Sequence, residues 1–155
     1  MPDADWLPDL ETFSGEWQPY EDKIYAIYVA DFITREASWR SKRITLRFNP
    51  PYKDKSFTYW HLTSESDGKG DRIPDLRRCE RIRWPKAIIQ APPDAVRSWA
   101  QQRDKVERIG IAVPDFSYVL FLQPAEDRAH LLTAYYVERP SRREQYRNEW
   151  LANKR

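Results

Sequence analysis

His61 is the residue of this chain best suited to moving a proton, and it lies in the motif Trp60-His61-Leu62-Thr63. Histidine titrates near neutral pH and is the usual general acid or base in enzymes. Thr63 and the polar residues after it could position the imidazole or bind a phosphate oxygen. Structural histidines are common, so a half-buried His61 bonded to a backbone carbonyl is the competing interpretation.

An arginine-rich segment runs from Asp71 to Lys86 and holds five arginines and one lysine against three acids. Guanidinium groups match phosphate oxygens in geometry and charge. On a helix, Arg77 and Arg81 lie one turn apart, so a phosphate could bind between them. The alternative is an exposed helix with internal ion pairs, which charge alone favours. Cys79 is expected on the apolar side of this helix, in the core.

The segment Leu131–Val137 is the third candidate because it carries hydroxyl groups on a predicted strand. Alternation along a strand places Thr133 and Tyr135 on one face, together with Leu131 and Val137. Their hydroxyls either line a site or are half-buried within the sheet, since both residue types are good strand formers. His130 is expected at the solvent rim.

Length and composition predict one domain over residues 1–155. Cys79 is the only cysteine, so no intrachain disulfide is possible and a reducing, cytoplasmic location is expected. Two histidines and no Cys-x-x-Cys pattern argue against a histidine-rich or zinc-ribbon site, and no metal or cofactor is expected. The N-terminal residues resemble no signal peptide, and no apolar run is long enough to span a membrane.

Charge is unevenly distributed along the chain. Residues 1–36 carry nine acids and two bases, whereas residues 37–155 carry 24 bases and 15 acids. The basic part predicts a polyanionic partner, either RNA or DNA. The alternative is that the acidic N-terminal helix packs near the basic part and neutralises it.

The elements that would position these residues follow from hydrophobic periodicity. An irregular lead is expected over residues 1–15, and apolar side chains at steps of three and four predict an amphipathic helix over Glu16–Arg35. Alternation predicts a strand over Lys42–Phe48, and Phe57–Leu62 is interpreted as a second, short strand. Pro74–Trp84 is predicted as a basic helix, capped by Asp71 and ended by Pro85.

Four further strands are predicted close together in the sequence, so an antiparallel meander is the economical arrangement. They are Val96–Gln102, Val106–Val113, Ser117–Gln123 and His130–Val137. A last helix is predicted over Ser141–Ala152. The expected fold is therefore α+β, with an antiparallel sheet of four to five strands and helices packed on it.

Three of these segments occur together in a recognisable order: Trp60-His61-Leu62-Thr63, Asp71–Pro85 and Leu131–Val137. In this respect the chain resembles the phage-associated branch of the barnase–EndoU–colicin–RelE ribonuclease superfold. The resemblance covers Phe57 to Glu138 and identifies residues 57–138 as a nuclease-like core.

The resemblance implies a metal-independent endoribonuclease, toxin- or phage-associated, that cleaves RNA through its own 2′-hydroxyl. It also implies RNA as the partner and allows an inhibitor protein. The implied catalytic residues are His61, Arg77, Thr133 and Tyr135, and the implied substrate-binding residues are Thr63, Arg72, Arg81, Trp84 and Lys86. Two alternatives stay open, namely a nucleic-acid-binding module without catalysis and an interaction component of a mobile element.

Overall fold

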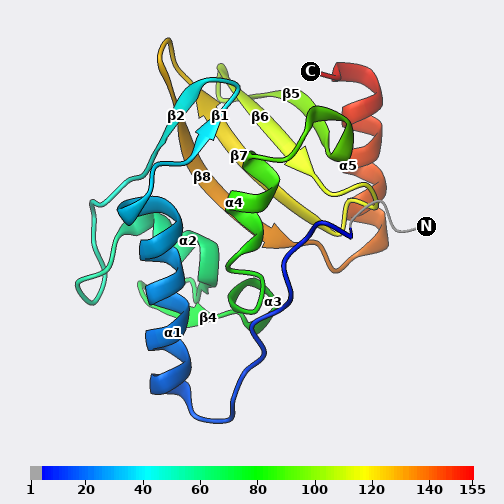
Figure 1. The fold of residues 1–155 in the computed structure, drawn as a ribbon. Helices are drawn as coiled ribbons and strands as arrows, with labels where there is room; N and C mark the ends of the chain where they lie inside the picture. The colour runs from blue at the N-terminus through cyan, green and yellow to red at the C-terminus, as the bar shows by residue number, and fades with distance from the viewer. Residues whose placement is uncertain (1–4) are drawn as a thin grey trace.

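The computed structural model describes residues 5–155 and has a six-stranded sheet in the order β1-β2-β8-β7-β6-β5 (Figure 1). Its strands are β1 Ser38–Trp39, β2 Lys42–Thr45, β5 Arg97–Arg103, β6 Val106–Ala112, β7 Tyr118–Pro124 and β8 Arg128–Tyr136. A second, two-stranded sheet pairs β3 Ser64–Ser66 with β4 Arg72–Pro74. The helices are α1 Trp17–Val29, α2 Phe57–Thr63, α3 Leu76–Cys79, α4 Trp84–Ile89 and α5 Pro140–Asn153, with a π-helical turn over Ala30–Thr34 and a 3-10 turn over Pro93–Ala95.

The predicted α+β class is confirmed, and β5 to β8 form the predicted antiparallel meander. The sheet is nevertheless mixed and larger than predicted, because β2 pairs in parallel with β8 through Ile44 and Ala129. A parallel neighbour needs a long crossover connection, and residues 46–127 provide it. The short strand β1, which pairs with β2, had no alternating pattern from which to predict it.

Two hydrophobic cores lie on opposite faces of the sheet. On one face, α1, α2 and α4 bury large side chains that include Tyr28, Tyr59 and Ile88. On the other face, α5 buries Tyr146 against Trp99 and Phe121. Figure 1 shows the result, with α1 and α5 on opposite sides of the molecule.

Gly110 of β6 lies directly beneath the indole of Trp99 in the α5 core. A Cβ atom at Gly110 would stand 2.6 Å from Cζ2 of that indole. Trp99 is completely buried, and its Nε1 donates a hydrogen bond to Glu149 of α5 at 3.0 Å. Because Gly110 has no side chain, the indole of Trp99 can lie against β6. From this position Trp99 holds α5 to the sheet through its hydrogen bond to Glu149.

The amphipathic helix predicted over Glu16–Arg35 is confirmed as α1 with its π-helical turn. The strand predicted over Phe57–Leu62 is wrong, because this segment is the helix α2. Its N-cap is Ser56, whose hydroxyl accepts a hydrogen bond from the backbone N–H of Tyr59. Aromatic residues favour strands only when a sheet neighbour is available, and here the rings pack into the helical core.

The basic helix predicted over Pro74–Trp84 is also corrected. Pro74 belongs to β4, the helix α3 is a single turn capped by Asp75 instead of Asp71, and a second helix begins at Trp84. Pro85 lies in the first turn of α4 and does not end a helix. The first turn of a helix leaves its N–H groups unpaired, so a proline is tolerated there.

A bulge in β8 changes which of its side chains share a face. Phe121 pairs with Thr133, but the next residue of β7 pairs with Leu131, so Leu132 is the extra residue. Leu131 consequently lies in the core beneath α1 and α2, whereas Tyr135 packs on the α5 side. The predicted shared face of Leu131 and Tyr135 is therefore wrong.

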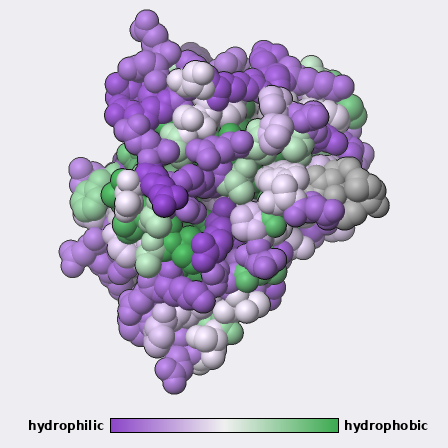
Figure 2. Space-filling view, in the orientation of Figure 1, coloured by the Kyte–Doolittle hydropathy of each residue, from purple (hydrophilic) through white to green (hydrophobic). Residues whose placement is uncertain are grey.

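The face of the molecule that Figure 2 shows is mostly polar. On the face shown in Figure 2, hydrophilic side chains dominate and apolar ones form small, separate patches. Within residues 5–155, the helices are too short or too polar to cross a membrane.

Candidate functional site

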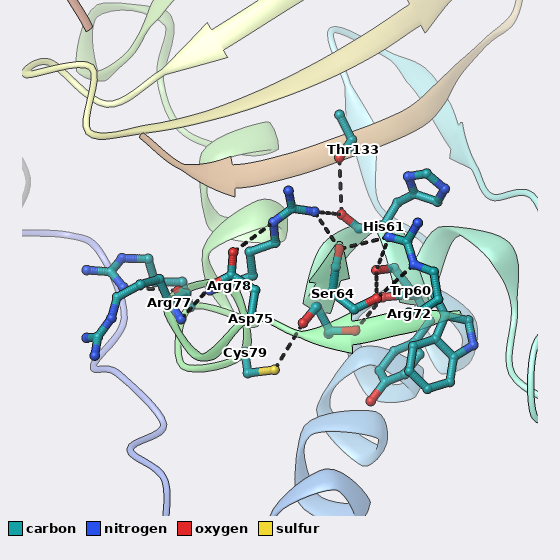
Figure 3. A network of polar contacts seen from close by, with 12 residues as sticks. Trp60, His61, Ser64, Arg72, Asp75, Arg77, Arg78, Cys79 and Thr133 are labelled. Carbon is teal, nitrogen blue, oxygen red and sulfur yellow. Dashed lines mark hydrogen bonds and ion pairs between the residues drawn. The ribbon is translucent and has the colours of Figure 1, made fainter. Parts of the chain in front are cut away.

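One of the predicted arginines, Arg72, binds the C-terminal end of α2 together with Arg78, which was not predicted as a site residue (Figure 3). Arg72 donates hydrogen bonds to the carbonyl oxygens of Trp60 at 3.2 Å and Ser64 at 2.8 Å. Arg78 donates to the carbonyl oxygens of His61 at 3.1 Å and Ser64 at 2.7 Å. The last carbonyl groups of a helix lack internal partners and carry partial negative charge. Both guanidinium groups therefore cap the C-terminal end of α2.

Thr133 reaches the same place from β8. Its hydroxyl donates to the carbonyl oxygen of His61 at 3.1 Å. In Figure 3 this oxygen faces Arg78 and Thr133, while the imidazole of His61 points the other way. The structure thus brings the arginine-rich segment and the strand of Thr133 together at the backbone carbonyl of His61. The imidazole of His61 points away from this meeting point.

The imidazole of His61 is half-buried against Phe57, with 4.1 Å between the ring centroids. Burial, together with the positive charges of Arg72, Arg78 and Arg47, lowers the pKa of His61 to about 4. A histidine with such a pKa is neutral at pH 7 and is a weak base. The ring lines neither of the two large hollows described below.

The low pKa of His61 predicts a loss of stability in acid. The unfolded chain takes up a proton near the ordinary pKa of 6.5, whereas the folded chain does so only near 4. The contribution of the neutral His61 to the free energy of unfolding is therefore fully present above pH 6.5, and it falls as the pH drops towards 4. Because the ring is partly solvated, we expect the loss to be about 1–2 kcal/mol.

Urea unfolding at several pH values checks this, with His61→Gln as the reference that lacks the titrating group. From pH 7 to pH 4 the wild type should lose about 1–2 kcal/mol more stability than His61→Gln does. Parallel stability curves for the two proteins would show that His61 is not desolvated.

Arg77 and Arg81 meet at a carboxylate instead of leaving a gap for phosphate. Glu80 is buried and accepts from Arg77 at 2.6 Å and from Arg81 at 3.0 Å. Arg81 also lies over the ring of Tyr136, 4.3 Å from its centroid. The side chain of Arg77 is about half exposed, whereas that of Arg81 is largely buried, so Arg77 is the more accessible of the two to a phosphate.

Of the three other candidates, two make hydrogen bonds inside the fold. Thr63 is buried and donates to the carbonyl of Tyr59 at 3.0 Å. Trp84 donates from Nε1 to the carbonyl of Pro8 at 2.9 Å. Lys86 lies on α4 and, like the other two, lines neither large hollow.

Cys79 is buried, as predicted, and its thiol donates to the carbonyl of Thr63 at 3.2 Å. Burial raises the pKa of Cys79 to about 12. Such a thiol stays protonated and is a poor nucleophile.

A hollow of about 670 Å³ lies between α5 and strands β5 to β8. We call it the α5 hollow. Thr133 and Tyr135 line it together with Arg108, Arg142 and Tyr146. The hydroxyls of Tyr135 and Tyr146 are in direct hydrogen-bond contact.

A second hollow of about 550 Å³ lies between α3 and the start of α5, and we call it the α3 hollow. Arg77, Arg78 and Arg139 line it. Tyr135 and Arg142 line both hollows, so the two adjoin. We call the two adjoining hollows together the arginine groove.

Most of the arginines that line the arginine groove form no ion pair within residues 5–155. The groove is lined by seven arginines, Arg77, Arg78, Arg103, Arg108, Arg139, Arg142 and Arg155. Among residues 5–155, only Arg77 and Arg78 of this set form ion pairs, with Glu80 and Asp75. Five carboxylates also line it, but Glu65, Glu107 and Glu138 are exposed to solvent and form no ion pair.

Arg108 is the most enclosed of the unpaired arginines. Its guanidinium lies over the ring of Phe121, with Cζ 4.4 Å from the ring centroid. Burial lowers the pKa of Arg108, and the charge of Arg103 adds to this effect. An arginine nevertheless remains protonated at neutral pH, so a positive charge is held here without a carboxylate partner.

Sequence reasoning missed most residues of the α5 hollow, including Arg108, Arg142, Tyr146 and Glu149. Each belongs to an element that was predicted correctly, on β6 or α5. The only sequence feature that could have indicated these residues is the large number of charged side chains in the strand and in the terminal helix. Nothing in the order of residues indicates that these two elements face each other.

Comparisons of this chain with protein-family models, with curated proteins and with solved structures find no match. Within residues 5–155, no group of three histidine, cysteine or carboxylate side chains is arranged to hold a metal ion.

Proposed function

We propose that this chain binds single-stranded RNA along the arginine groove. The observation that carries the proposal is the set of five arginines that line this groove without an ion pair, Arg103, Arg108, Arg139, Arg142 and Arg155. Unpaired guanidinium groups bind phosphate oxygens strongly because they match them in shape and charge. A row of them suits a polyanion better than a single small anion.

The aromatic side chains of the groove favour RNA with exposed bases. Tyr135 is partly exposed and lines both hollows, whereas Phe121 is buried beneath Arg108. Basic grooves with aromatic rings are typical of proteins that bind single strands, because each base offers a face for stacking. A hollow of about 670 Å³ is large enough for one nucleotide.

The first test is the salt dependence of RNA binding. Fluorescence anisotropy with a labelled oligonucleotide should show binding that weakens steeply with salt, since each phosphate contact releases counterions. Replacing Arg139 and Arg142 together by glutamine should weaken binding roughly tenfold or more and reduce the slope of log K against log salt by about 1.4.

The matched control replaces two exposed arginines outside the groove, Arg35 and Arg43, by glutamine. This variant has the same net charge as the groove variant and should bind within about twofold of the wild type. Equal losses for the two variants would assign binding to overall charge, and absent binding would refute the proposal.

Cleavage of the bound RNA through its own 2′-hydroxyl is the second candidate function. It is favoured by one observation: Thr133, Tyr135 and Arg77, three of the four residues implied to be catalytic, line the arginine groove. In this reaction the 2′-oxygen attacks the phosphorus atom and gives up its proton to water, a cyclic phosphate forms, and the 5′-oxygen leaves and takes a proton from water. Groove arginines would stabilise the charge that develops on the phosphate.

The binding mixtures themselves test cleavage when they are run on a denaturing gel in the presence of a chelator. Cleavage should give 2′,3′-cyclic phosphate ends and should stop when the RNA carries a 2′-deoxyribose at the cut. RNA that is bound but uncut would leave this chain as a binding module.

A further inference from the structure

Two polar atoms beside the α5 hollow are buried without a hydrogen-bond partner, Oε1 of Gln101 and Nε of Arg108. The two residues face each other directly across β5 and β6, so their side chains lie next to each other on one face of the sheet. Both residues line the α5 hollow. An acceptor and a donor that lack partners are therefore adjacent at its wall.

Glu149 sets the orientation of the Gln101 amide. Its Oε1 accepts from Nε2 of Gln101 at 3.0 Å and from Nε1 of Trp99 at 3.0 Å. The amide nitrogen is thereby occupied, and the amide oxygen is left as a free acceptor. The second carboxylate oxygen of Glu149 has only a weak contact, with Gln145 at 3.5 Å.

The wall of the hollow thus presents a fixed series of groups: the carboxylate of Glu149, the amide oxygen of Gln101 and the guanidinium of Arg108. The first two accept hydrogen bonds, and the third donates several in one plane. Guanine carries the complementary series along its edge, since N2–H and N1–H are donors and O6 and N7 are adjacent acceptors.

We propose that the α5 hollow is a guanine-binding subsite, which rests on the proposed RNA-binding function and specifies it. The N2 and N1 hydrogens of the base are donated to Glu149 and Gln101, and Arg108 donates to O6 and N7. Small rotations of the two side chains bring their unpartnered atoms towards the base. The other bases fit less well, because none of them has two adjacent donors next to two adjacent acceptors.

Mononucleotides test this inference, because they separate base recognition from groove binding. In calorimetric titrations of the full chain, GMP should bind at least about tenfold more tightly than AMP, CMP or UMP. Two analogues remove single groups of the base. IMP lacks the N2 amino group that meets Glu149, and 7-deaza-GMP lacks the N7 acceptor that meets Arg108. Each should bind several-fold more weakly than GMP.

Using ligand analogues keeps the protein unchanged, so a misfolded variant cannot mimic the expected result. Equal affinities for the four mononucleotides, or for GMP and its two analogues, would overturn the guanine assignment. If oligonucleotides still bind in the salt-dependent way described above, the RNA-binding function stands without it. If neither mononucleotides nor oligonucleotides bind, both proposals fail.

Discussion

Replacing Arg78 by alanine should lower the free energy of unfolding by about 3 kcal/mol, whereas the same change at the neighbouring Arg77 should cost less than about 1 kcal/mol. Arg78 is largely buried and donates from Nη1 to the carbonyl oxygens of His61 and Ser64. Alanine would leave Ser64 with one donor fewer and Asp75 without its ion-pair partner at 3.4 Å. Arg77 is about half exposed, and its partner Glu80 would keep its bond to Arg81.

Urea unfolding of the two variants measures this difference, and RNA binding by the folded fraction shows whether Arg78 also contacts ligand. A clear loss of stability for Arg78→Ala with little loss for Arg77→Ala would show that Arg78 stabilises the C-terminal end of α2. If the two variants are equally stable, the hydrogen bonds of Arg78 do not hold the helix end in solution. A stable Arg78→Ala protein that no longer binds RNA would instead assign this guanidinium to the groove.

Replacing Gly110 by alanine should destabilise the fold by about 2–3 kcal/mol, even though it adds a single methyl group. The added Cβ would overlap three atoms of the Trp99 indole, at 2.6 to 2.8 Å. Trp99 is fully buried and bonded to Glu149, so the ring cannot move without loosening α5. We therefore expect the affinity for GMP to fall together with stability, since α5 forms one wall of the hollow.

A double-mutant cycle with Trp99→Phe provides the control for this prediction. The smaller ring should relieve the overlap, so Gly110→Ala should cost at least about 1 kcal/mol less in the Trp99→Phe protein than in the wild type. An identical cost in both backgrounds would mean that the close approach of Trp99 to Gly110 is not the cause.

The arrangement at α2 shows why arginine-rich segments are difficult to interpret from sequence. Arg72 and Arg78 bind helix carbonyls, and Arg77 and Arg81 share one buried carboxylate. Each of these contacts satisfies the same donors that a phosphate would satisfy. The number of arginines in a segment therefore indicates how many acceptors its guanidinium groups need. Only the folded chain shows how many of these acceptors belong to the protein itself.

The elements with strong local periodicity could be predicted from the order of residues. The helix Glu16–Arg35, the four strands of the meander and the terminal helix all follow from the spacing of apolar residues, which is a local property. The burial of Cys79 also followed from its place among apolar neighbours. The short helix α2 was misjudged because seven residues are too few for a helical period to stand out from strand-like aromatic content.

The tertiary structure alone decided which side chains meet. The parallel pairing of β2 with β8 and the packing of α5 on the sheet join segments that are far apart in the chain, and no local pattern encodes such distances. The bulge at Leu132 moved Tyr135 to the α5 face, where it joins the two hollows. The arginine groove exists because these long-range contacts place Arg108 and Arg142 on facing elements, where neither forms an ion pair within residues 5–155.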